Sequence, residues 1–341
     1  MKDVFENKTI LVTGGCGSIG SEIVKQLLEY NPEAVRVFDY DEAGHFRLSQ
    51  IIKSNKIRHL IGDIRDRERL RRAMEGVNIV FHAAALKHVH LCEYNPFEAV
   101  STNVIGTQNL IDAAINARVD KFIGISTDKA VNPINTMGAT KLLSEKIIIS
   151  APIGKSNVKF CCVRFGNVLS SIGSVMPIFD NQIKKGGPVT ITDEKMTRFF
   201  MSMSDAVNLV LKAALETRGG ETFIFKMRSL RIKDLADAMV ELLAPRYGRK
   251  PEDISFEIIG TRPGEKSSES LVSLEEIEHL TELDNMFVLK NPLQFGSFSD
   301  NQKNDLTEGG KKVNIGEYNS AKVPLLSKEE IKMTLQEQKI I

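Results

Sequence analysis

The sequence predicts an α/β fold in which helices cover both faces of a parallel sheet, followed by a smaller C-terminal lobe. Two observations support this prediction. Short apolar segments alternate with longer helical patterns over residues 1–166, and each return to the sheet then requires a crossover connection. Three glycines also lie where the first strand meets the first helix. Together these features are typical of a Rossmann-like doubly wound sheet.

The elements of this first part follow from apolar periodicity and from turn residues. Strands are expected at 9–13, 34–38, 59–61, 78–82, 121–126 and 159–165. Helices are expected at 19–30, about 45–53, 65–75, 97–117 and 137–150. In the first helix Ile23, Val24 and Leu27 share one face, which is the pattern of an amphipathic helix. Pro32 stops that helix because the residue before a proline avoids the helical conformation.

Composition excludes several classes of protein. The 341 residues carry 45 Lys plus Arg and 44 Asp plus Glu, so no overall positive field draws the chain to nucleic acid or to a membrane. No apolar run reaches the roughly 20 residues that span a bilayer, and the start MKDVFENKT does not resemble a signal peptide. A cytoplasmic protein is therefore expected. Its four cysteines lack metal-binding spacing, which predicts reduced thiols and no metal site.

The glycine-rich turn after the first strand predicts a phosphate-binding site. Gly14, Gly17 and Gly20 follow a strand and open a helix, the context that a dinucleotide fingerprint needs. Gly14 permits the tight turn, Gly17 lets a pyrophosphate approach the backbone, and Gly20 lets the helix pack closely on the strand. Ser18 and Ile19 lie at the helix N-terminus, whose N–H groups and dipole favour anions.

Later strand ends complete the expected cofactor site. Asp39 ends the second strand, where a carboxylate binds the adenosine ribose hydroxyls. Together, Asp39, Asp41 and Glu42 would repel a 2′-phosphate and favour NAD, whereas Arg36 or Arg47 would reverse this preference, so both cofactors stay open. The other expected cofactor contacts at strand ends are Asp63, Ile64, Ala83 and Ala84.

These features divide the chain into three regions. Residues 1–166 form the expected dinucleotide-binding domain, to which a segment at about 190–225 returns. Residues 167–295 contain frequent Gly and Pro turns and mainly form the expected lobe. Residues 296–341 form the third region, with a polar, Gly-rich loop at 296–322. A serine followed by acidic residues predicts a final helix at 327–338.

Five stretches of the chain resemble a single family. They are 126–141 (STDKAVNPINTMGATK), 164–168 (RFGNV), 173–177 (GSVMP), 197–200 (TRFF) and 261–266 (TRPGEK). With the spacing of the glycines, they resemble the UDP-N-acetylglucosamine 4,6-dehydratases of pseudaminic acid and capsule pathways, which are extended short-chain dehydrogenases/reductases. The resemblance covers about residues 5–290.

The resemblance implies a set of ligands and an assembly. It implies tightly bound NAD or NADP that is recycled within each turnover, UDP-N-acetylglucosamine as substrate, and a nucleotide-sugar-binding role for the lobe at 167–295. The helices at 97–117 and 137–150 correspond to those that form the dimer contact in the family. A homodimer or a higher homo-oligomer is therefore expected, with no nucleic-acid or membrane partner.

The sequence departs from the family pattern at two places. Met137 stands where most members have a tyrosine, four residues before Lys141. A thioether has no proton to give or take, so Met137 cannot act as the acid or base. After Glu265 and Lys266 the family often continues Leu-His-Glu, whereas this chain has Ser267-Ser268-Glu269.

The reaction of the family assigns roles to the residues that follow the fifth strand. Oxidation at sugar C4 acidifies the C5 proton, its loss expels the C6 hydroxyl as water, and reduction at C6 completes the reaction. Asp128 and Lys129 lie at the sheet edge where ligands bind in such folds. We assign Asp128 as the general acid for the C6 hydroxyl and Lys129 as the base at C5. Lys129 or Thr127 handles the C4 hydroxyl proton, and Lys141 binds the nicotinamide ribose.

The remaining contacts are implied by the resemblance. Asn103 has a cofactor-loop role in the family, and Lys87 contacts the sugar or the nicotinamide. Arg262 offers a planar fork for the diphosphate. The implied substrate contacts are Lys87, His88, Met137, Asn167, Val175, Arg198, Arg262 and Glu265. His82, at a strand end, is expected to be a buried core histidine and not a catalyst.

Two alternatives stay open at this point. Without the tyrosine, the hydride could return to C4, which would give a UDP-sugar with a 5,6-alkene in place of the 4-keto-6-deoxy sugar. Alternatively, the chain could be a non-catalytic sensor that only binds NAD or NADP. Retention of Asp128, Lys129 and Lys141 argues against the sensor. A 4-epimerase is less favoured, because that chemistry normally depends on the tyrosine.

Overall fold

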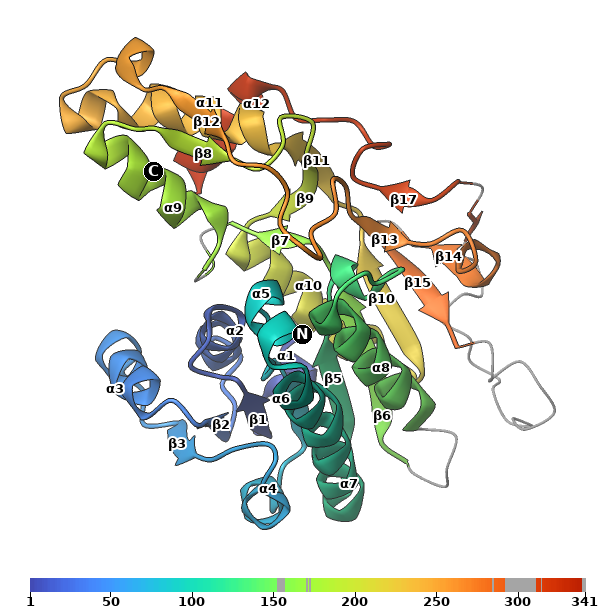
Figure 1. Cartoon of the computed structure of the whole chain (residues 1–341). Helices are drawn as coiled ribbons and strands as arrows, with labels where there is room; N and C mark the ends of the chain where they lie inside the picture. Colours follow the sequence, from blue (N-terminus) through green and yellow to red (C-terminus); the bar gives the residue numbers. More distant parts are fainter. Residues whose placement is uncertain are drawn as a thin grey trace.

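A computed structural model describes residues 1–151, 157–169, 171, 173–283, 285–291, 311–313 and 315–338. Figure 1 shows a central sheet with helices on both of its faces and a second group of elements above it. The sheet has ten strands in the order β16-β14-β15-β10-β6-β5-β4-β1-β2-β3. The predicted Rossmann-like doubly wound sheet is therefore confirmed.

The parallel part of the sheet runs from β3 to β10. Its strands are β1 (Thr9–Thr13), β2 (Ala34–Asp39), β3 (Ile57–Ile61), β4 (Ile79–His82), β5 (Lys121–Ile125), β6 (Lys159–Arg164) and β10 (Glu221–Phe225). The antiparallel edge consists of β15 (Met286–Lys290), β14 (Leu280–Glu282) and β16 (Lys311–Lys312). The order reverses between β1 and β4, and ligands of such sheets bind at this switch point.

The two faces of the sheet are buried by different helices. Alternate side chains of a strand point to opposite faces, so Ile10 and Val12 share one core with Val24 and Val210, while Leu11 joins another with Leu110. The first face carries α2 (Ser18–Leu28), α3 (Glu42–Ile51) and α10 (Met203–Glu216). The second face carries α4 (Arg67–Met74), α7 (Thr107–Ala117) and α8 (Thr136–Ser150).

The helix predicted at 97–117 is more complex than its periodicity indicates. It consists of α6 (Pro96–Val100), a π-helical segment (Ser101–Gly106) and α7. A further short helix, α5 (Val89–Tyr94), precedes it, and α1 (Lys2–Phe5) precedes the sheet. The π-helical segment places Asn103 inside the protein, where it is 1% exposed. From there its side chain reaches the backbone of Leu86 in the loop after β4.

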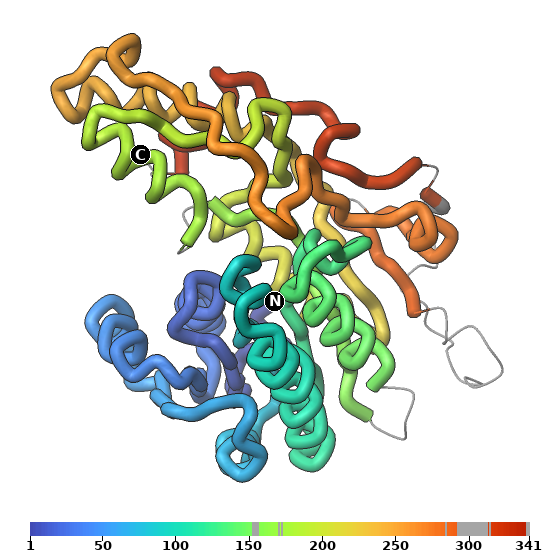
Figure 2. Tube along the Cα trace, viewed as in Figure 1, coloured from blue at the N-terminus to red at the C-terminus, as the bar shows by residue number. Residues whose placement is uncertain are grey.

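The second lobe has its own core. Its helices are α9 (Val175–Lys185), α11 (Ile232–Leu243) and α12 (Lys328–Glu337), which is the predicted C-terminal helix. Small sheets are formed by β7 (Asn167–Val168), β9 (Thr197–Met201) and β11 (Arg228–Arg231), by β8 (Val189–Ile191) and β12 (Phe256–Ile258), and by β13 (Ser270–Val272) and β17 (Tyr318–Asn319). Figure 2 shows how the chain passes repeatedly between this lobe and the central sheet.

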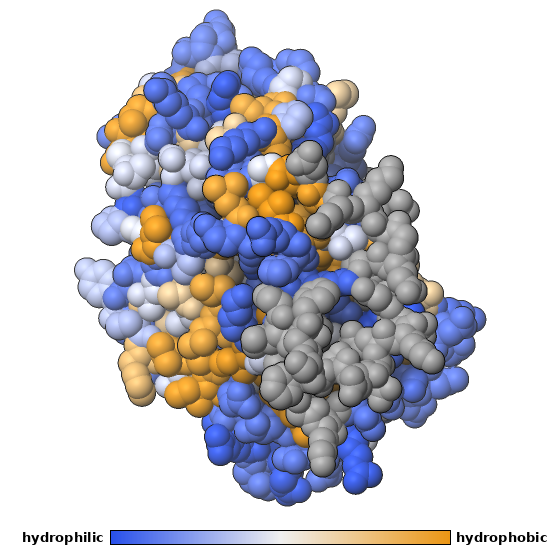
Figure 3. All heavy atoms as spheres, turned by 90° about the vertical axis from the view of Figure 1, so that its right-hand side faces the viewer, coloured by the Kyte–Doolittle hydropathy of each residue, from blue (hydrophilic) through white to orange (hydrophobic). Residues whose placement is uncertain are grey.

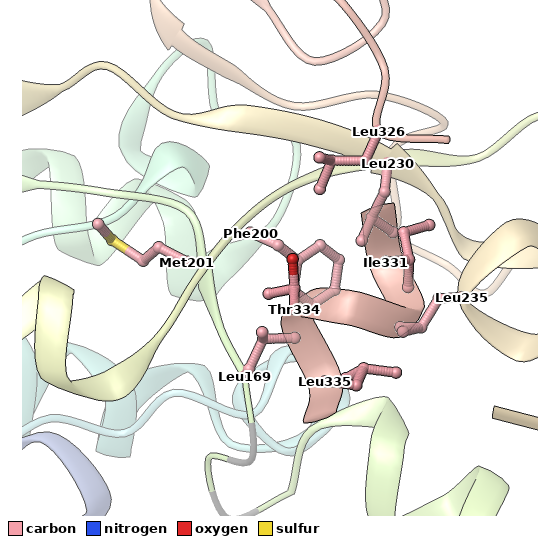
Figure 4. A pocket seen from close by; sticks show the side chains of 9 residues that line it. All are labelled: Leu169, Phe200, Met201, Leu230, Leu235, Leu326, Ile331, Thr334 and Leu335. Carbon is pink, nitrogen blue, oxygen red and sulfur yellow. The ribbon is translucent and has the colours of Figure 1, made fainter. Parts of the chain in front are cut away.

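Helix α12 closes the lobe over an apolar cavity. Ile331 and Leu335 of α12 point toward Leu230 and Leu235 (Figure 4). The cavity has a volume of about 40 Å³. Ser327 begins α12 with a reciprocal capping box to Glu330, which satisfies N–H groups that the helix leaves free.

Two further observations bear on the predicted regions. Strands β14 and β15 join the central sheet, although they belong to the segment expected to form mainly the lobe. The predicted polar loop lies outside the described residues from 296 to 310 and at 314. Within the described part of the chain, no helix combines the length and the apolar character that crossing a bilayer requires.

Candidate functional site

The glycine-rich turn packs closely on the next strand end. Gly14 has φ +65°, and a Cβ there would lie 2.6 Å from the backbone nitrogen of Ala84. A Cβ at Gly20 would overlap the carbonyl oxygen of Gly14. Gly17 caps α2, and among the described side chains none caps this helix end. A Cβ at Gly17 would meet only the Gly14 oxygen within 4 Å, at 3.2 Å, so the space in front of α2 is open.

The carboxylate of Asp39 is fixed beside this turn. It accepts hydrogen bonds from the N–H groups of Cys16 (3.0 Å) and Asp41 (3.1 Å). Arg47 is paired with Asp41 at 2.9 Å. Arg36 donates to the carbonyl oxygens of Ala73 and Glu75 at 2.8 and 2.7 Å. Both arginines considered for a 2′-phosphate are thus engaged with other groups.

The other predicted cofactor residues lie around the same edge. Asp63 pairs with Arg65 at 2.6 Å, and hydrogen bonds from Arg65 hold the pKa of Asp63 below its ordinary value. Ile64 is buried, and a Cβ at Gly106 would lie 2.7 Å from it. Ala83 donates its N–H to the oxygen of Thr13 at 3.0 Å, which continues the pairing of β4 with β1.

Asn103 fixes the loop that follows β4. Its Oδ1 accepts from the N–H of Leu86 at 2.8 Å, and its Nδ2 donates to the carbonyl of Leu86 at 3.0 Å. Asn103 therefore positions Lys87 and His88 through the backbone. Burial lowers the pKa of Lys87. Burial, with Lys87 and His90 nearby, also lowers the pKa of His88. A Cβ at Gly173 would lie 2.5 Å from the His88 ring, so this loop touches the lobe.

The residues assigned to proton transfer form one contact chain. After β5, Thr127 begins a 3₁₀ turn over Asp128–Ala130. Thr127 Oγ1 donates to Asp128 Oδ1 at 2.9 Å, and Lys129 Nζ pairs with the same oxygen at 2.9 Å. Asp128 is 0% exposed, and its Oδ2 has no hydrogen-bond partner among the described residues. Lys129 Nζ also lies 3.5 Å from Asn167 Oδ1.

Sequence reasoning missed a second carboxylate beside Lys129. Glu269 Oε1 lies 3.9 Å from Lys129 Nζ, although 140 positions separate the two residues in the sequence. Burial pulls the pKa of Lys129 down, but Asp128 and Glu269 outweigh this effect and leave that pKa above its ordinary value. A glutamate directly before the buried run Ser270–Val272 is the signal that could have drawn attention to it.

Lys141 and Met137 lie on the first turns of α8. Lys141 Nζ donates to the carbonyl of Ile125 at 2.5 Å, and burial lowers the pKa of Lys141. Met137 is 4% exposed and packs with Cys92 and Ala99. The side chain that replaces the tyrosine therefore belongs to an apolar cluster under the loop that carries Lys87.

Residues 264–266 of the lobe are hydrogen-bonded to residues 131–135, which follow Asp128. Lys266 Nζ donates to the carbonyls of Val131 (2.9 Å) and Asn132 (2.8 Å), and Asn135 donates to the carbonyl of Gly264 at 2.8 Å. These bonds bring residues 261–269 against the end of β5. Arg262 and Glu265 belong to this segment, and Arg198 is bound to it through the carbonyl of Lys266.

The predicted substrate residues of the lobe differ in how they are held. Arg198 is 5% exposed and donates to the carbonyls of Thr197 and Lys266, both at 2.7 Å. Glu265 lies 3.9 Å from Arg198 and accepts from the N–H of Arg262 at 3.3 Å. Arg262 itself is exposed, and Val175 is the first residue of α9. Among the described residues of the lobe, Asn167 is the one that accepts a hydrogen bond from Lys129.

A buried ion network lies behind the site. Arg164 is 0% exposed and pairs with Glu145 of α8 and with Glu276, the latter at 2.9 Å. Ser126, directly before Thr127, donates to Glu145 at 2.6 Å. This network joins β6, α8, the end of β5 and the segment after β13.

His82 confirms the prediction of a core histidine. It is 3% exposed and shares hydrogen bonds with Thr13 (2.8 Å) and Thr107 (2.9 Å). Burial, with a contribution from Lys141, lowers the pKa of His82 to about 3. The ring is therefore neutral at physiological pH.

Comparisons with known proteins find relatives along nearly the whole chain. Residues 10–291 match a family described as polysaccharide biosynthesis protein. A protein of Methanocaldococcus jannaschii, described as an uncharacterised membrane protein, is 56% identical over 99% of this chain and 98% of its own length. The UDP-N-acetylglucosamine 4,6-dehydratase (inverting) of Campylobacter jejuni is 42% identical over 96% of each chain.

Two further comparisons concern the reaction type and the fold. A UDP-glucose 4-epimerase of Rickettsia rickettsii is 41% identical over 97% of this chain and 96% of its own. The X-ray structure of Pen from Bacillus thuringiensis matches with a TM-score of 0.91 at 42% identity, and covers 99% of both chains. The fold is thus shared with a solved structure over nearly its full length.

Proposed function

This chain belongs to the polysaccharide biosynthesis family that contains UDP-N-acetylglucosamine 4,6-dehydratases, and from this premise we propose that it removes water across C5 and C6 of UDP-N-acetylglucosamine. The observation that carries the proposal is the contact, 2.9 Å long, between the buried Asp128 and the partly buried Lys129 at the carboxyl end of β5. A lysine and a carboxylate in contact can supply the base and the acid that an elimination needs.

The residues of the glycine turn fit a dinucleotide. The open space before α2 suits a pyrophosphate, and Asp39 suits the adenosine ribose hydroxyls. The engagement of Arg36 and Arg47 with other groups favours NAD over NADP. When bound, the nicotinamide supplies a reversible hydride acceptor for sugar C4. Lys141, 2.5 Å from the Ile125 carbonyl, is the residue that holds its ribose.

The ion pair explains how one contact can prepare both the base and the acid. Without substrate, Lys129 is an ammonium, because two carboxylates raise its pKa. Moving its proton to Asp128 gives a neutral amine and a protonated carboxyl in a single step. Lys129 then takes the C5 proton, and Asp128 gives its proton to the C6 hydroxyl, which leaves as water. Thr127, 2.9 Å from Asp128, relays the C4 hydroxyl proton to solvent, and Lys129 returns a proton to C5 when C6 is reduced.

The lobe supplies the substrate contacts in this proposal. Arg198 is buried at the junction between the lobe and the end of β5, Asn167 contacts Lys129, Glu265 is partly buried, and Arg262 is exposed. Arg262 suits the diphosphate because a guanidinium binds phosphate oxygens in a bidentate manner. Lys87 and His88 lie on the loop held by Asn103, and the His88 ring faces Gly173 of the lobe.

A homodimer is part of the same proposal. Several large apolar side chains around α5 to α8 are exposed, including Tyr94 (88%), Phe97 (71%) and Leu143 (48%). Figure 3 shows patches of hydrophobic surface on the side of the molecule that carries α8. A second copy would bury such a surface. Light scattering at increasing protein concentration tests this assembly.

The test is an incubation of the protein with UDP-N-acetylglucosamine in deuterated water, followed by proton NMR. A 4-keto-6-deoxy product with deuterium at C5 supports the proposal. Exocyclic alkene signals would support the 5,6-unsaturated product, which the burial of Met137 among apolar groups keeps open. A 4-epimer without deuterium at C5 would contradict dehydration, and binding of NAD without any turnover would support the sensor.

A further inference from the structure

Lys129 lies between two carboxylates that come from distant parts of the chain. Asp128 is its neighbour in sequence and contacts it at 2.9 Å. Glu269 approaches from the lobe, with Oε1 at 3.9 Å from Lys129 Nζ. Glu269 is 3% exposed, and its Oε2 has no hydrogen-bond partner among the described residues. A buried carboxylate that lacks hydrogen bonds is costly unless charges compensate it.

The backbone of Glu269 is held by the C-terminal part of the chain. Its N–H donates to Ser320 Oγ at 3.0 Å, and its carbonyl accepts from the N–H of Ser320 at 2.8 Å. Ser320 Oγ also shares a hydrogen bond with Thr197 Oγ1 at 2.8 Å. The pairing of β13 with β17 continues this connection. These bonds fix the position of the backbone from which the carboxylate faces Lys129.

The other charges near Glu269 give it no hydrogen bond. Lys266 Nζ lies 4.0 Å from Oε2 but donates to the carbonyls of Val131 and Asn132. Arg198 donates to carbonyls of its own strand and of the 261–269 loop. Burial raises the pKa of Glu269, and the negative charge of Asp128 raises it further. The positive charges of Lys129, Arg198 and Lys266 act in the opposite direction. Lys129 and Lys266 therefore compensate the carboxylate from nearly equal distances, 3.9 and 4.0 Å, and of the two only Lys129 also pairs with Asp128.

We propose that Glu269 is a positioning residue for Lys129, which holds the ammonium between two carboxylates and sets the pH at which Lys129 becomes a neutral base. The inference rests on the proposed function, because it concerns the residue assigned to take the C5 proton. A negative charge close to an ammonium in a poorly solvated site stabilises the charged form. Loss of the Glu269 charge therefore makes Lys129 easier to deprotonate.

The experiment measures the titration of Lys129 directly. Acetic anhydride reacts with the neutral amine only, so the rate of Lys129 acetylation against pH, followed by mass spectrometry, reports its pKa without turnover. In Glu269→Gln this titration should move to lower pH by at least about one unit, as expected for removing a unit charge at about 4 Å. Glu269→Asp keeps the charge on a shorter side chain and should restore part of the shift.

Turnover in deuterated water provides the second measurement. The rise of kcat with pH should move in Glu269→Gln by the same amount as the acetylation titration. Glu276→Gln is the matched control, since Glu276 is a partly buried carboxylate a few residues away that pairs with Arg164. The Glu276→Gln variant should have a lower unfolding temperature and an unchanged Lys129 titration.

The outcomes separate the inference from the proposed function. A Lys129 titration that does not move in folded Glu269→Gln would overturn the inference, even if the enzyme turns over. A titration that moves in a protein without dehydratase activity would support the inference and contradict the proposed function. A shift of equal size in Glu276→Gln would also overturn it, because the effect would then be a general consequence of disturbing this region.

Discussion

The two parts of the proposed site, the cofactor part around the glycine turn (the nucleotide side) and the substrate part around Lys129 (the sugar side), are built in different ways. On the nucleotide side, backbone groups and small residues from adjacent strands pack against one another, as Gly14 does on Ala84. On the sugar side, poorly solvated charges from remote segments meet, as the partly buried Lys129 and the buried Glu269 do. The first arrangement depends on the absence of side chains, and the second on the compensation of charges. Substitutions should therefore damage the two sides separately.

Lys129→Ala should have the largest effect and should break only the sugar side. Loss of a general base lowers turnover by about 10²–10⁴-fold, whereas the glycine turn stays intact and NAD still binds. NMR of the product and titration with NAD measure the two effects. Unchanged turnover would remove Lys129 from the mechanism, and loss of NAD binding would contradict the separation of the two sides.

Arg164→Met should strongly destabilise the protein through the ion network behind the sugar side. It leaves the carboxylates of Glu145 and Glu276 buried without their cation, which costs about 3–5 kcal/mol. Urea unfolding measures this loss. Arg71→Met is the control, since its pair with Glu68 has a similar distance of 2.8 Å but is exposed and screened by solvent, so its loss should change stability very little. Equal losses would mean that burial of the network is unimportant.

Gly14→Ala should break only the nucleotide side. A Cβ at this position meets the Ala84 backbone, and φ +65° is unfavourable for alanine. Displacement of the turn should weaken NAD binding at least about tenfold, or roughly 1.4 kcal/mol. Gly76→Ala is the control, because Gly76 has φ +69° and no neighbouring atom within 4 Å of a Cβ. Calorimetry should find normal NAD affinity in the control; a similar loss in both variants would assign the effect to the backbone alone.

Asp39→Asn should have the smallest effect and should sharpen the assignment of the cofactor. The N–H groups of Cys16 and Asp41 bind different oxygens of the carboxylate, so the amide keeps an acceptor for only one of them, and it also loses the negative charge. The preference for NAD over NADP should fall by about tenfold, because a carboxylate repels a 2′-phosphate. Competition between the two cofactors measures this ratio. An unchanged ratio would mean that Asp39 does not select the cofactor.

The predictions from sequence succeed where neighbours in the chain also become neighbours in space. The doubly wound sheet, the family resemblance and the burial of His82 are confirmed, because strand periodicity and short motifs are local signals. The π-helical segment around Asn103 was missed because its amino acids do not differ from those of an ordinary helix. The placement of Glu269 and of Arg164 depends on packing between segments more than a hundred residues apart.

The hydrogen bonds between Glu269 and Ser320 also affect the order in which the protein matures during synthesis. The two residues are 51 positions apart, so a ribosome has produced the whole glycine turn and the Asp128–Lys129 pair well before Ser320 emerges. A nascent chain can therefore form its nucleotide-binding half early, while the surroundings of Lys129 are completed only afterwards. Stalled or truncated chains that lack Ser320 would bind the cofactor, but the hydrogen bonds that fix Glu269 beside Lys129 would be missing.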